Sequence, residues 1–289
     1  LCWNGQFYTH FKKLDPVEIP GLDESSQLSL SNPMAINRGV ATHEMAVSII
    51  QEYQRRRGTG SAFAEWYSID PPFPDGIFGE EKLVAGSYVN GGIMPLVGGE
   101  LARAAFDHGF EEYGVDILRR YHALISEKGE SFLWYSPDGT PASVETSTSP
   151  EAQPTDGWGS SAMLFALVRG LAGIEDKGRG FDAVQLSPRW PAAGVKEAEV
   201  RVGYEASGAG FAYTYHAHPD GIEMGIETEE SSVIFHVLLP SETTVLSVMV
   251  NDAEKAFETG RIRESNYLDF TSSISGEARV EIKTKGPKR

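Results

Sequence analysis

A helical pattern begins at the end of a short stretch that reads Tyr88-Val89-Asn90-Gly91-Gly92-Ile93-Met94-Pro95. Proline suits the first turn of a helix, because its fixed φ is already helical and the amide hydrogen that it lacks would be unpaired there. After Pro95 the apolar residues Val97, Leu101 and Ala105 recur at helical spacing, until Gly109 breaks the pattern. We therefore predict a helix that starts at Pro95 and ends just before Gly109.

Two long irregular loops lie on either side of this helix and its neighbour. Residues 61–92 form the first loop, a second helical pattern covers residues 111–126, and residues 127–157 form the second loop. Loops of this length inside a compact domain are usually functional or poorly ordered. A further helix is expected directly after the second loop, with Ser160 and Ser161 at its cap.

After Gly173 the sequence changes character, and β-branched and aromatic residues alternate between turn residues. Short strands at intervals of about ten residues are typical of an antiparallel sandwich. We divide the chain into a helical part, residues 1–175, and a β-sandwich, residues 176–289. The strands that this pattern predicts are residues 198–204, 210–216, 222–227, 233–239 and 245–250.

The composition excludes several classes of function. The 289 residues carry 25 Lys and Arg against 41 Asp and Glu, a net charge of −16, which argues against nucleic acid and anionic membranes as partners. No stretch approaches ~20 continuous apolar residues, so no membrane span is expected. The single cysteine, Cys2, excludes an internal disulfide framework and favours a cytoplasmic location. Because the chain opens with Leu1 inside a strand-like pattern, we expect the true N-terminus to lie upstream.

The two loops hold most of the aromatic and polar side chains that could bind a ligand. Flat aromatic rings beside carboxylates and amides suit sugars, because a ring can stack on a sugar face while the hydroxyls need hydrogen-bond partners. The alternative is that the aromatic side chains only pin the loops onto the helices. The residues expected to bind substrate are Trp66, Tyr67, Asp70, Asn90, Trp134 and Trp158.

No cofactor or metal is expected. None of the seven histidines stands at a recognised metal-ligand spacing from another ligand, and no phosphate-binding glycine motif occurs. The stretch from Gly157 to Ser161 contains serines, but it lacks the form of a nucleophile elbow. The remaining catalytic candidates are carboxylates, of which glycoside cleavage needs two.

Glu151 is the preferred catalytic residue. It lies between Pro150 and Pro154, just before the start of a predicted helix, where the helix dipole favours the ionised carboxylate that a base requires. A solvated loop glutamate is the alternative interpretation. Glu145, in the same loop, is the second choice for the base.

Several of these motifs resemble the six-hairpin glycosidase superfamily, which includes trehalases, processing α-glucosidases, α-rhamnosidases and cellobiose-type phosphorylases. Asn90-Gly91-Gly92 followed by Pro95 is similar to a segment that opens a helix in these enzymes. Glu151 and the run from Asp156 to Gly159 are similar to the trehalase segment that carries the catalytic base, although the glycine-rich run before it is absent. The turn from Trp134 to Gly139 resembles the one that precedes that segment.

The resemblance covers about residues 1–175 and implies a fold and an activity. The implied fold is the C-terminal part of an α/α toroid built of helical hairpins, followed by the β-sandwich. The implied activity is an inverting glycoside hydrolase with Glu151 as general base and an Asp general acid upstream of residue 1. A carbohydrate is then the expected partner, whereas the sugar, the linkage and the oligomeric state stay open.

Two other functions compete with hydrolysis. A glycoside phosphorylase would need a cationic phosphate pocket, but Lys82 and Lys128 are the only lysines between residues 61 and 157. A carbohydrate-binding protein without catalysis would need only the aromatic and polar side chains of the loops.

Overall fold

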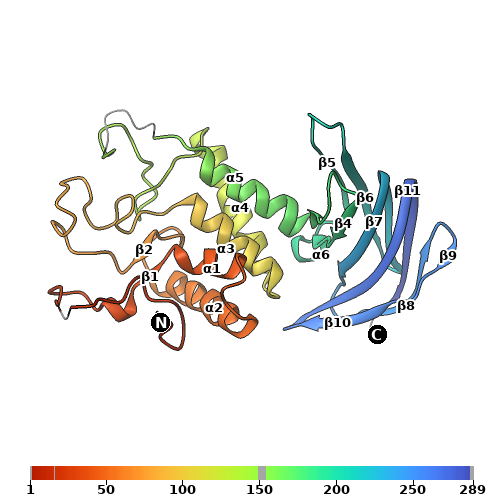
Figure 1. Cartoon of the computed structure of the whole chain (residues 1–289), viewed down its shortest axis with the longest axis horizontal. Coiled ribbons are helices and arrows are strands. Elements are labelled where there is room, and N and C mark those ends of the chain that lie inside the picture. The colour runs from red at the N-terminus through yellow and green to blue at the C-terminus, as the bar shows by residue number, and fades with distance from the viewer. Residues whose placement is uncertain (1, 16, 149–153, 287–289) are drawn as a thin grey trace. The chain divides into compact units, whose positions relative to one another are not determined.

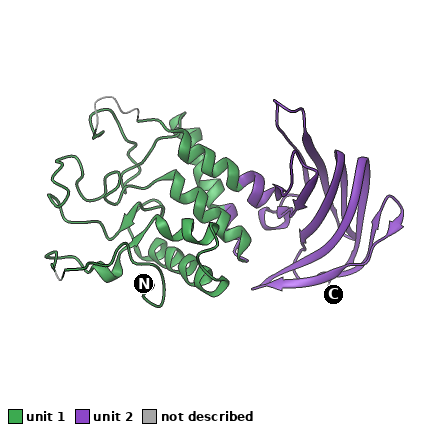
Figure 2. Ribbon diagram, in the orientation of Figure 1, with its two compact units in different colours: residues 1–108, 116–166 green, residues 109–115, 167–289 purple. Residues whose placement is uncertain are grey.

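The computed structural model describes residues 2–15, 17–148 and 154–286 (Figure 1). The chain divides into two compact units (Figure 2). Unit 1 comprises Leu1–His108 and Asp116–Ala166, and unit 2 comprises Gly109–Val115 and Leu167–Arg289. That residues 1–175 and 176–289 fold as separate domains stays a prediction.

The regular secondary structure of unit 1 is mainly helical, and long loops connect its helices. Its helices are α1 (Ser31–Asn37), α2 (His43–Thr59), α3 (Pro95–Asp107), most of α4 (Glu111–Lys128) and α5 (Gly157–Phe165). The short strands β1 (Leu28–Ser29) and β2 (Ile69–Asp70) pair antiparallel, and a 3₁₀ turn covers Glu24–Ser26.

The predicted helix at Pro95 is confirmed, whereas the predicted cap of α5 is wrong. Pro95 is the first residue of α3, which ends at Asp107. The N-cap of α5 is Asp156, which is extended and accepts a hydrogen bond of 2.9 Å from the amide of Gly159. A carboxylate at this position also interacts favourably with the helix dipole. Ser160 therefore lies inside the first turn.

Helix α3 packs against α1, α2 and α5. Two glycines of α3 allow α5 to approach it closely. A Cβ at Gly99 would come within 2.4 Å of the backbone of Ala162. A Cβ at Gly98 would come within 2.5 Å of the Met163 side chain and 2.7 Å of the Trp66 ring. Glycine in a helix costs about 1 kcal/mol relative to alanine, and the close helix contact offsets this cost.

Unit 2 is built on one nine-stranded mixed sheet. Among the described strands of this sheet, only the pair β4–β7 is parallel. The unit also contains α6 (Trp190–Ala193) and all but the first residue of a π-helical segment (Ala166–Leu171). The strands are β3 (Ile174–Asp176), β4 (Ala183–Leu186), β5 (Glu197–Gly203), β6 (Gly210–His218), β7 (Gly221–Leu238), β8 (Thr244–Val250), β9 (Ala253–Glu254), β10 (Glu258–Ile262) and β11 (Ser265–Lys285).

The predicted fold class, a partial α/α toroid of helical hairpins followed by an antiparallel β-sandwich, is wrong. The described residues form six helices and one large mixed sheet. The sheet was underestimated because β11, its longest strand, lies beyond the last strand that the sequence predicts, and because β7 was divided into two strands.

The sequence pattern predicts two strands where the structure has the single strand β7. The reason is that the buried side chains of β7 fall at even-numbered positions in its first half and mainly at odd-numbered positions in its second half. Ile222 and Met224 are buried in its first half, and Val233 and Phe235 are buried in its second half. Opposite this change, Ser275 of β11 pairs with Glu230 and Gly276 pairs with Thr228, so Glu229 is left without a partner. This is a β-bulge, which inserts one residue and restores the same buried face. In the sequence, the change of parity and the polar run look like a turn.

Deleting Glu229 should abolish the fold of unit 2. Without the extra residue, one half of β7 must turn its apolar side chains to solvent, and each such side chain contributes about 1.5–3 kcal/mol when buried. We expect the variant to aggregate or to lose its cooperative transition in urea, followed by circular dichroism. Replacing Glu229 with Gln should change the unfolding free energy by less than about 0.5 kcal/mol. A deletion variant with the same urea midpoint as the wild type would contradict the assignment of a β-bulge at Glu229.

The first turn of α4 belongs to unit 2 because Glu111 is anchored to the sheet. Its carboxylate is buried and accepts hydrogen bonds from the hydroxyls of Ser265, at 2.5 Å, and Tyr267. The Arg189 guanidinium donates to the same Tyr267 oxygen at 3.2 Å. Burial is the main cause of a raised pKa of the Tyr267 hydroxyl, so it remains a proton donor to the carboxylate.

Candidate functional site

The two long loops of unit 1 meet at Ile93. Its amide donates to the carbonyl of Tyr135 and the Tyr135 amide donates back, both at 2.8 Å. On its other side Ile93 forms an antiparallel bridge to Tyr67, and the next amide, of Met94, donates to the Trp66 carbonyl at 2.8 Å. Backbone from residues 66–67, 93–94 and 135 thus forms a three-segment ladder, which we call the Ile93 ladder. It brings together residues that lie far apart in the sequence.

The second loop is also paired with itself. The amide of Ala142 donates to the Trp134 carbonyl at 3.0 Å, and the amide of Leu133 donates to the Pro154 carbonyl at 2.9 Å. A tight turn at Gly139, whose φ is +89°, closes the first of these pairings. Residues 149–153 of this loop lie outside the described residues.

The predicted aromatic residues divide into buried and exposed ones. Trp66, Tyr67 and Trp134 are buried, and the Trp66 ring packs against Phe63 and under the Arg120 guanidinium, 5.1 Å from its centroid. Trp158, in the first turn of α5, is 68% exposed. The three buried rings help to hold the loops in place, Trp158 is open to contact with a ligand, and a sugar-binding role for any of the four stays a prediction.

The predicted polar residues make internal contacts. The Asn90 side chain accepts from the Phe73 amide at 2.7 Å and donates to the carbonyls of Phe73 and Leu83, both at 3.0 Å. Asp70 forms a 2.7 Å ion pair with Arg56, which also pairs with Glu52 at 2.7 Å. These contacts fix the first loop, and a sugar-binding role for Asn90 or Asp70 stays a prediction.

Of the two candidate bases, only Glu145 lies within the described residues, because Glu151 falls outside them. The pKa of the exposed Glu145 carboxyl is lowered, first by a hydrogen bond from Ser143 and further by the Lys82 charge. Glu145 is therefore ionised at neutral pH, as a base must be. Lys82 also links the two loops, because its Nζ donates to the Ser147 carbonyl at 2.6 Å.

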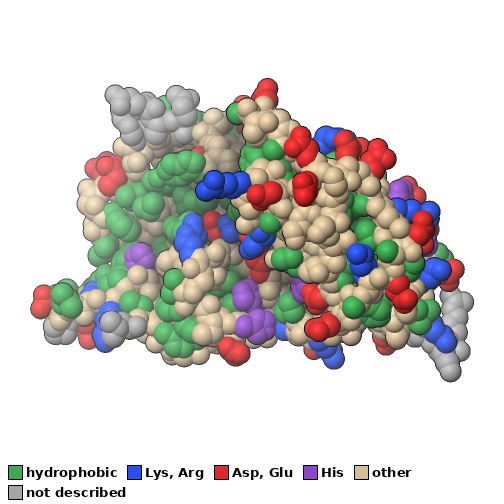
Figure 3. All heavy atoms as spheres, turned by 45° about the vertical axis from the view of Figure 1, so that its right-hand side comes forward, with side chains coloured by type: hydrophobic (Ala, Val, Ile, Leu, Met, Phe, Trp, Pro, Cys, Tyr) green, Lys and Arg blue, Asp and Glu red, His purple; other side chains and the backbone are tan. Residues whose placement is uncertain are grey.

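The surface of the two loops is partly apolar, and the carboxylate of Glu145 directly follows the exposed Val144 in the sequence. Hydrophobic side chains gather on this face of unit 1 (Figure 3). Phe63 is tied to the second loop, since its amide donates to the Pro137 carbonyl at 3.0 Å. A surface of this kind can contact the apolar faces of sugar rings while carboxylates accept from the hydroxyls. The exposed large apolar residues of the two loops and the start of α5 are Phe63, Ile77, Phe78, Val84, Val89, Val144 and Trp158.

The histidines give no metal centre, but two of them form a pair that the sequence did not reveal. No group of three potential metal ligands occurs among the residues that the structure describes. His43, the first residue of α2, and His108, which caps the end of α3, place their Nδ1 atoms 2.8 Å apart. Such a hydrogen bond needs a proton on only one of the two nitrogens. They were missed because 65 positions separate them.

The His43–His108 pair should make stability fall at acidic pH. Burial, and then the charge of His43, lower the pKa of His108, whereas the charge of Asp107 raises it. The folded protein therefore keeps His108 neutral, while the unfolded chain takes up a proton below its ordinary pKa of about 6.5. The stabilising contribution is present above about pH 6.5 and is lost as pH falls through the lower pKa of the folded state.

Replacing His108 with Gln should flatten the dependence of the unfolding free energy on pH between about 7 and 5. The matched control is the same replacement of the exposed His122 on α4. Urea unfolding at a series of pH values measures both. Equal slopes for the two variants would show that His108 does not carry the effect.

In the described part of the chain, no helix combines the length and apolar content required to cross a bilayer. No protein-family model and no curated protein matches the sequence. Solved structures do match. The α-L-rhamnosidase from Dictyoglumus thermophilum aligns with a TM-score of 0.54 at 14% identity, over 89% of this chain and 25% of that one. This structural neighbour is a glycoside hydrolase. At this identity the likeness shows the fold alone.

Two further matches are more distant and support no argument. A GH127 β-L-arabinofuranosidase from Geobacillus stearothermophilus T6 aligns with a TM-score of 0.31 at 10% identity, over 88% of this chain and 40% of that one. The α-L-rhamnosidase from Streptomyces avermitilis, complexed with L-rhamnose, aligns with a TM-score of 0.32 at 11% identity, over 88% and 31%. The present chain spans about a quarter of the length of the Dictyoglumus enzyme.

Proposed function

We propose that this chain is part of a glycoside hydrolase that acts on an oligosaccharide or a small glycoside. The Ile93 ladder carries the proposal, because it joins the two loops that hold the aromatic side chains and candidate carboxylates. The fold shared with a rhamnosidase supports it. The sugar that this neighbour's name gives makes α-L-rhamnosides the first substrate class to test.

The proposed mechanism is inverting hydrolysis. Glu151 activates a water molecule, and an Asp outside the 289 residues protonates the leaving oxygen. Two carboxyl groups that work in this way stand ~6.5–9.5 Å apart, with the water between them. Glu145 is the alternative base, since it is ionised and lies in the same loop.

In this proposal one exposed side chain contacts the sugar, and buried side chains support the loops that carry the site. Trp158 provides an exposed ring on which the apolar face of a sugar can stack. Trp66, Tyr67 and Trp134 hold the loop backbone beneath, and Asn90 and Asp70 fix the course of the first loop. In this arrangement the rigid buried residues position the few side chains that touch the sugar.

A glycoside phosphorylase ranks behind a hydrolase. It would need free positive charge in the loops to hold phosphate. Of the two lysines there, Lys82 donates to the Ser147 carbonyl and Lys128 forms an ion pair with Glu127 at 2.7 Å.

Replacing Glu151 with Gln in the complete enzyme should lower kcat by about 10²–10⁴-fold, because the water would lose its base. Sugar binding should persist, since the amide has the shape of the carboxyl. The assay is release of sugar from α- and β-linked glycosides, with and without phosphate. Undiminished turnover would overturn the role of Glu151, and loss of turnover in Glu145→Gln alone would move the base there. Phosphate-dependent turnover would indicate a phosphorylase.

Replacing Trp158 with Ala should raise KM by about three- to tenfold, the worth of one aromatic stacking contact, with a smaller effect on kcat. Leu164→Ala is the matched control, since Leu164 is also exposed on α5. An equal KM for both variants would remove Trp158 from the sugar site.

A further inference from the structure

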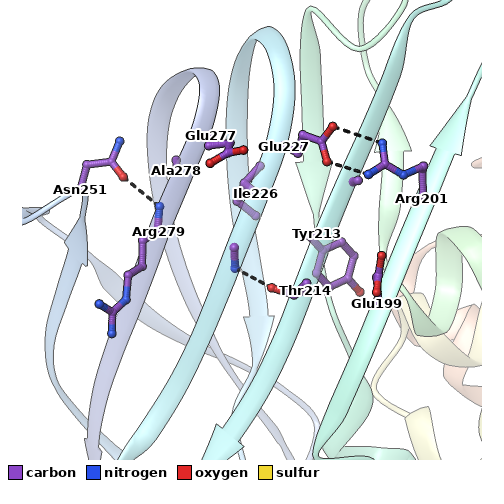
Figure 4. A pocket seen from close by; sticks show the side chains of 12 residues that line it. Glu199, Arg201, Tyr213, Thr214, Ile226, Glu227, Asn251, Glu277, Ala278 and Arg279 are labelled. Carbon is purple, nitrogen blue, oxygen red and sulfur yellow. Dashed lines mark hydrogen bonds and ion pairs between the residues drawn. The ribbon is translucent and has the colours of Figure 1, made fainter.

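A second candidate site lies entirely within unit 2, on the solvent-facing side of the sheet (Figure 4). It is a groove of about 540 Å³ that crosses β5, β6, β7 and β11 and reaches the turn after β8. This volume is within the range of about 300–1,000 Å³ that is usual for small-molecule sites.

The floor of the groove is low because small side chains stand next to one another on adjacent strands. Thr214 of β6 is directly opposite Gly225 of β7, and Ala212 follows on the same face of β6. The Gly225 amide donates to the Thr214 hydroxyl at 3.1 Å, and a Cβ at Gly225 would come within 2.9 Å of that hydroxyl. The hollow thus depends on glycine at this position.

The walls are planar charged groups that already have partners. On one side the Arg201 guanidinium of β5 donates two hydrogen bonds to Glu227 of β7, of 2.6 and 3.3 Å, across the intervening strand β6. On the other side Arg279 pairs with Glu281 at 2.9 Å and with Glu223 at 3.4 Å. Paired in this way, the groups are held in place and keep spare lone pairs and N–H groups for a ligand.

Two carboxylates of the lining, Glu199 and Glu277, form no ion pair with any residue that the structure describes. Glu277 stands directly opposite Glu227 in the register of β7 and β11. These carboxylates repel anions and are strong acceptors for hydroxyl donors. Asn251 completes the lining and accepts from the Arg279 amide at 2.8 Å, which leaves its own amide N–H groups available.

A peptide fits this groove poorly. A peptide that binds by adding a strand needs an open sheet edge, but β6 and β7 are paired on both sides here. Apolar side chains would also find no pocket, since Tyr213 and Ile226 are buried in the core. A neutral, hydroxyl-rich ligand suits the lining, because it can donate to the carboxylates and accept from the guanidinium groups without breaking their pairs.

We propose that the groove formed by Arg201, Thr214, Gly225, Glu227, Glu277 and Arg279 binds a neutral oligosaccharide. This inference goes beyond the proposed hydrolysis and does not depend on it, because it concerns binding by unit 2. Without an exposed aromatic ring in the lining, binding is weak and relies on charge-assisted hydrogen bonds.

The test is titration calorimetry of the intact chain with four neutral probes: maltotetraose, cellotetraose, xylotetraose and mannotetraose. Spermine and a heparin tetrasaccharide serve as cationic and anionic probes. We expect at least one neutral probe to bind, and the double variant R201Q/E277Q to weaken it by about tenfold or more. The control R261Q/E258Q makes the same charge change on β10, outside the groove, and should bind like the wild type. E277Q alone, an exposed isosteric change, provides the measurement if the double variant does not fold.

Three results would overturn the proposal. One is that no neutral probe binds at about 10 mM, a concentration well above weak dissociation constants. Another is that R201Q/E277Q and E277Q bind as tightly as R261Q/E258Q, which would place binding elsewhere. The third is that spermine or heparin binds more tightly and displaces the neutral probe. Loss of turnover in Glu151→Gln leaves this binding unchanged, so the two proposals fail separately.

Discussion

The pairing of Ile93 with Tyr67 on one side and Tyr135 on the other is the constraint on which unit 1 depends. Two long loops, of a kind that often lacks a fixed course, are joined there by backbone hydrogen bonds of 2.8 Å. Because Ile93 lies two residues before the first residue of the buried helix α3, its position is set by the core of the unit. Packing of α3 against α5 through Gly98 and Gly99 therefore also fixes where the loops meet.

Polar contacts beneath the loops complete this support. Arg120 forms a 2.8 Å ion pair with the fully buried Glu65 and covers the Trp66 ring, and Arg56 joins Asp70 to α2. Removing one partner of such a buried pair typically costs about 3–5 kcal/mol, because the other charge is left uncompensated. The carboxylates of the two loops thus differ in their surroundings. Glu65 and Asp70 form ion pairs that stabilise the loops, while Glu145 is exposed.

Local signals in the sequence predicted part of this fold. Pro95 marks the start of α3, and the alternation after Gly173 marks the strands of unit 2. The bulge at Glu229 interrupts the alternation of buried and exposed residues along β7, so this alternation could not reveal β7 as one strand of 18 residues. Likewise, aromatic residues in the loops were recognised, but their burial was not, since Trp66 is covered by Arg120 from a helix 54 positions away. The His43–His108 pair and the groove of unit 2 arise only when distant elements pair.

Amide hydrogen exchange of the intact chain tests the Ile93 ladder most directly. The account predicts that the amides of Ile93, Met94 and Tyr135 exchange as slowly as those inside α3, although two of the three bond with long loops. The amide of Glu81, in an exposed part of the first loop, should exchange quickly. Exchange at Ile93 and Tyr135 as fast as at Glu81 would show that the loops are not joined, and would remove the basis for a preformed carbohydrate site.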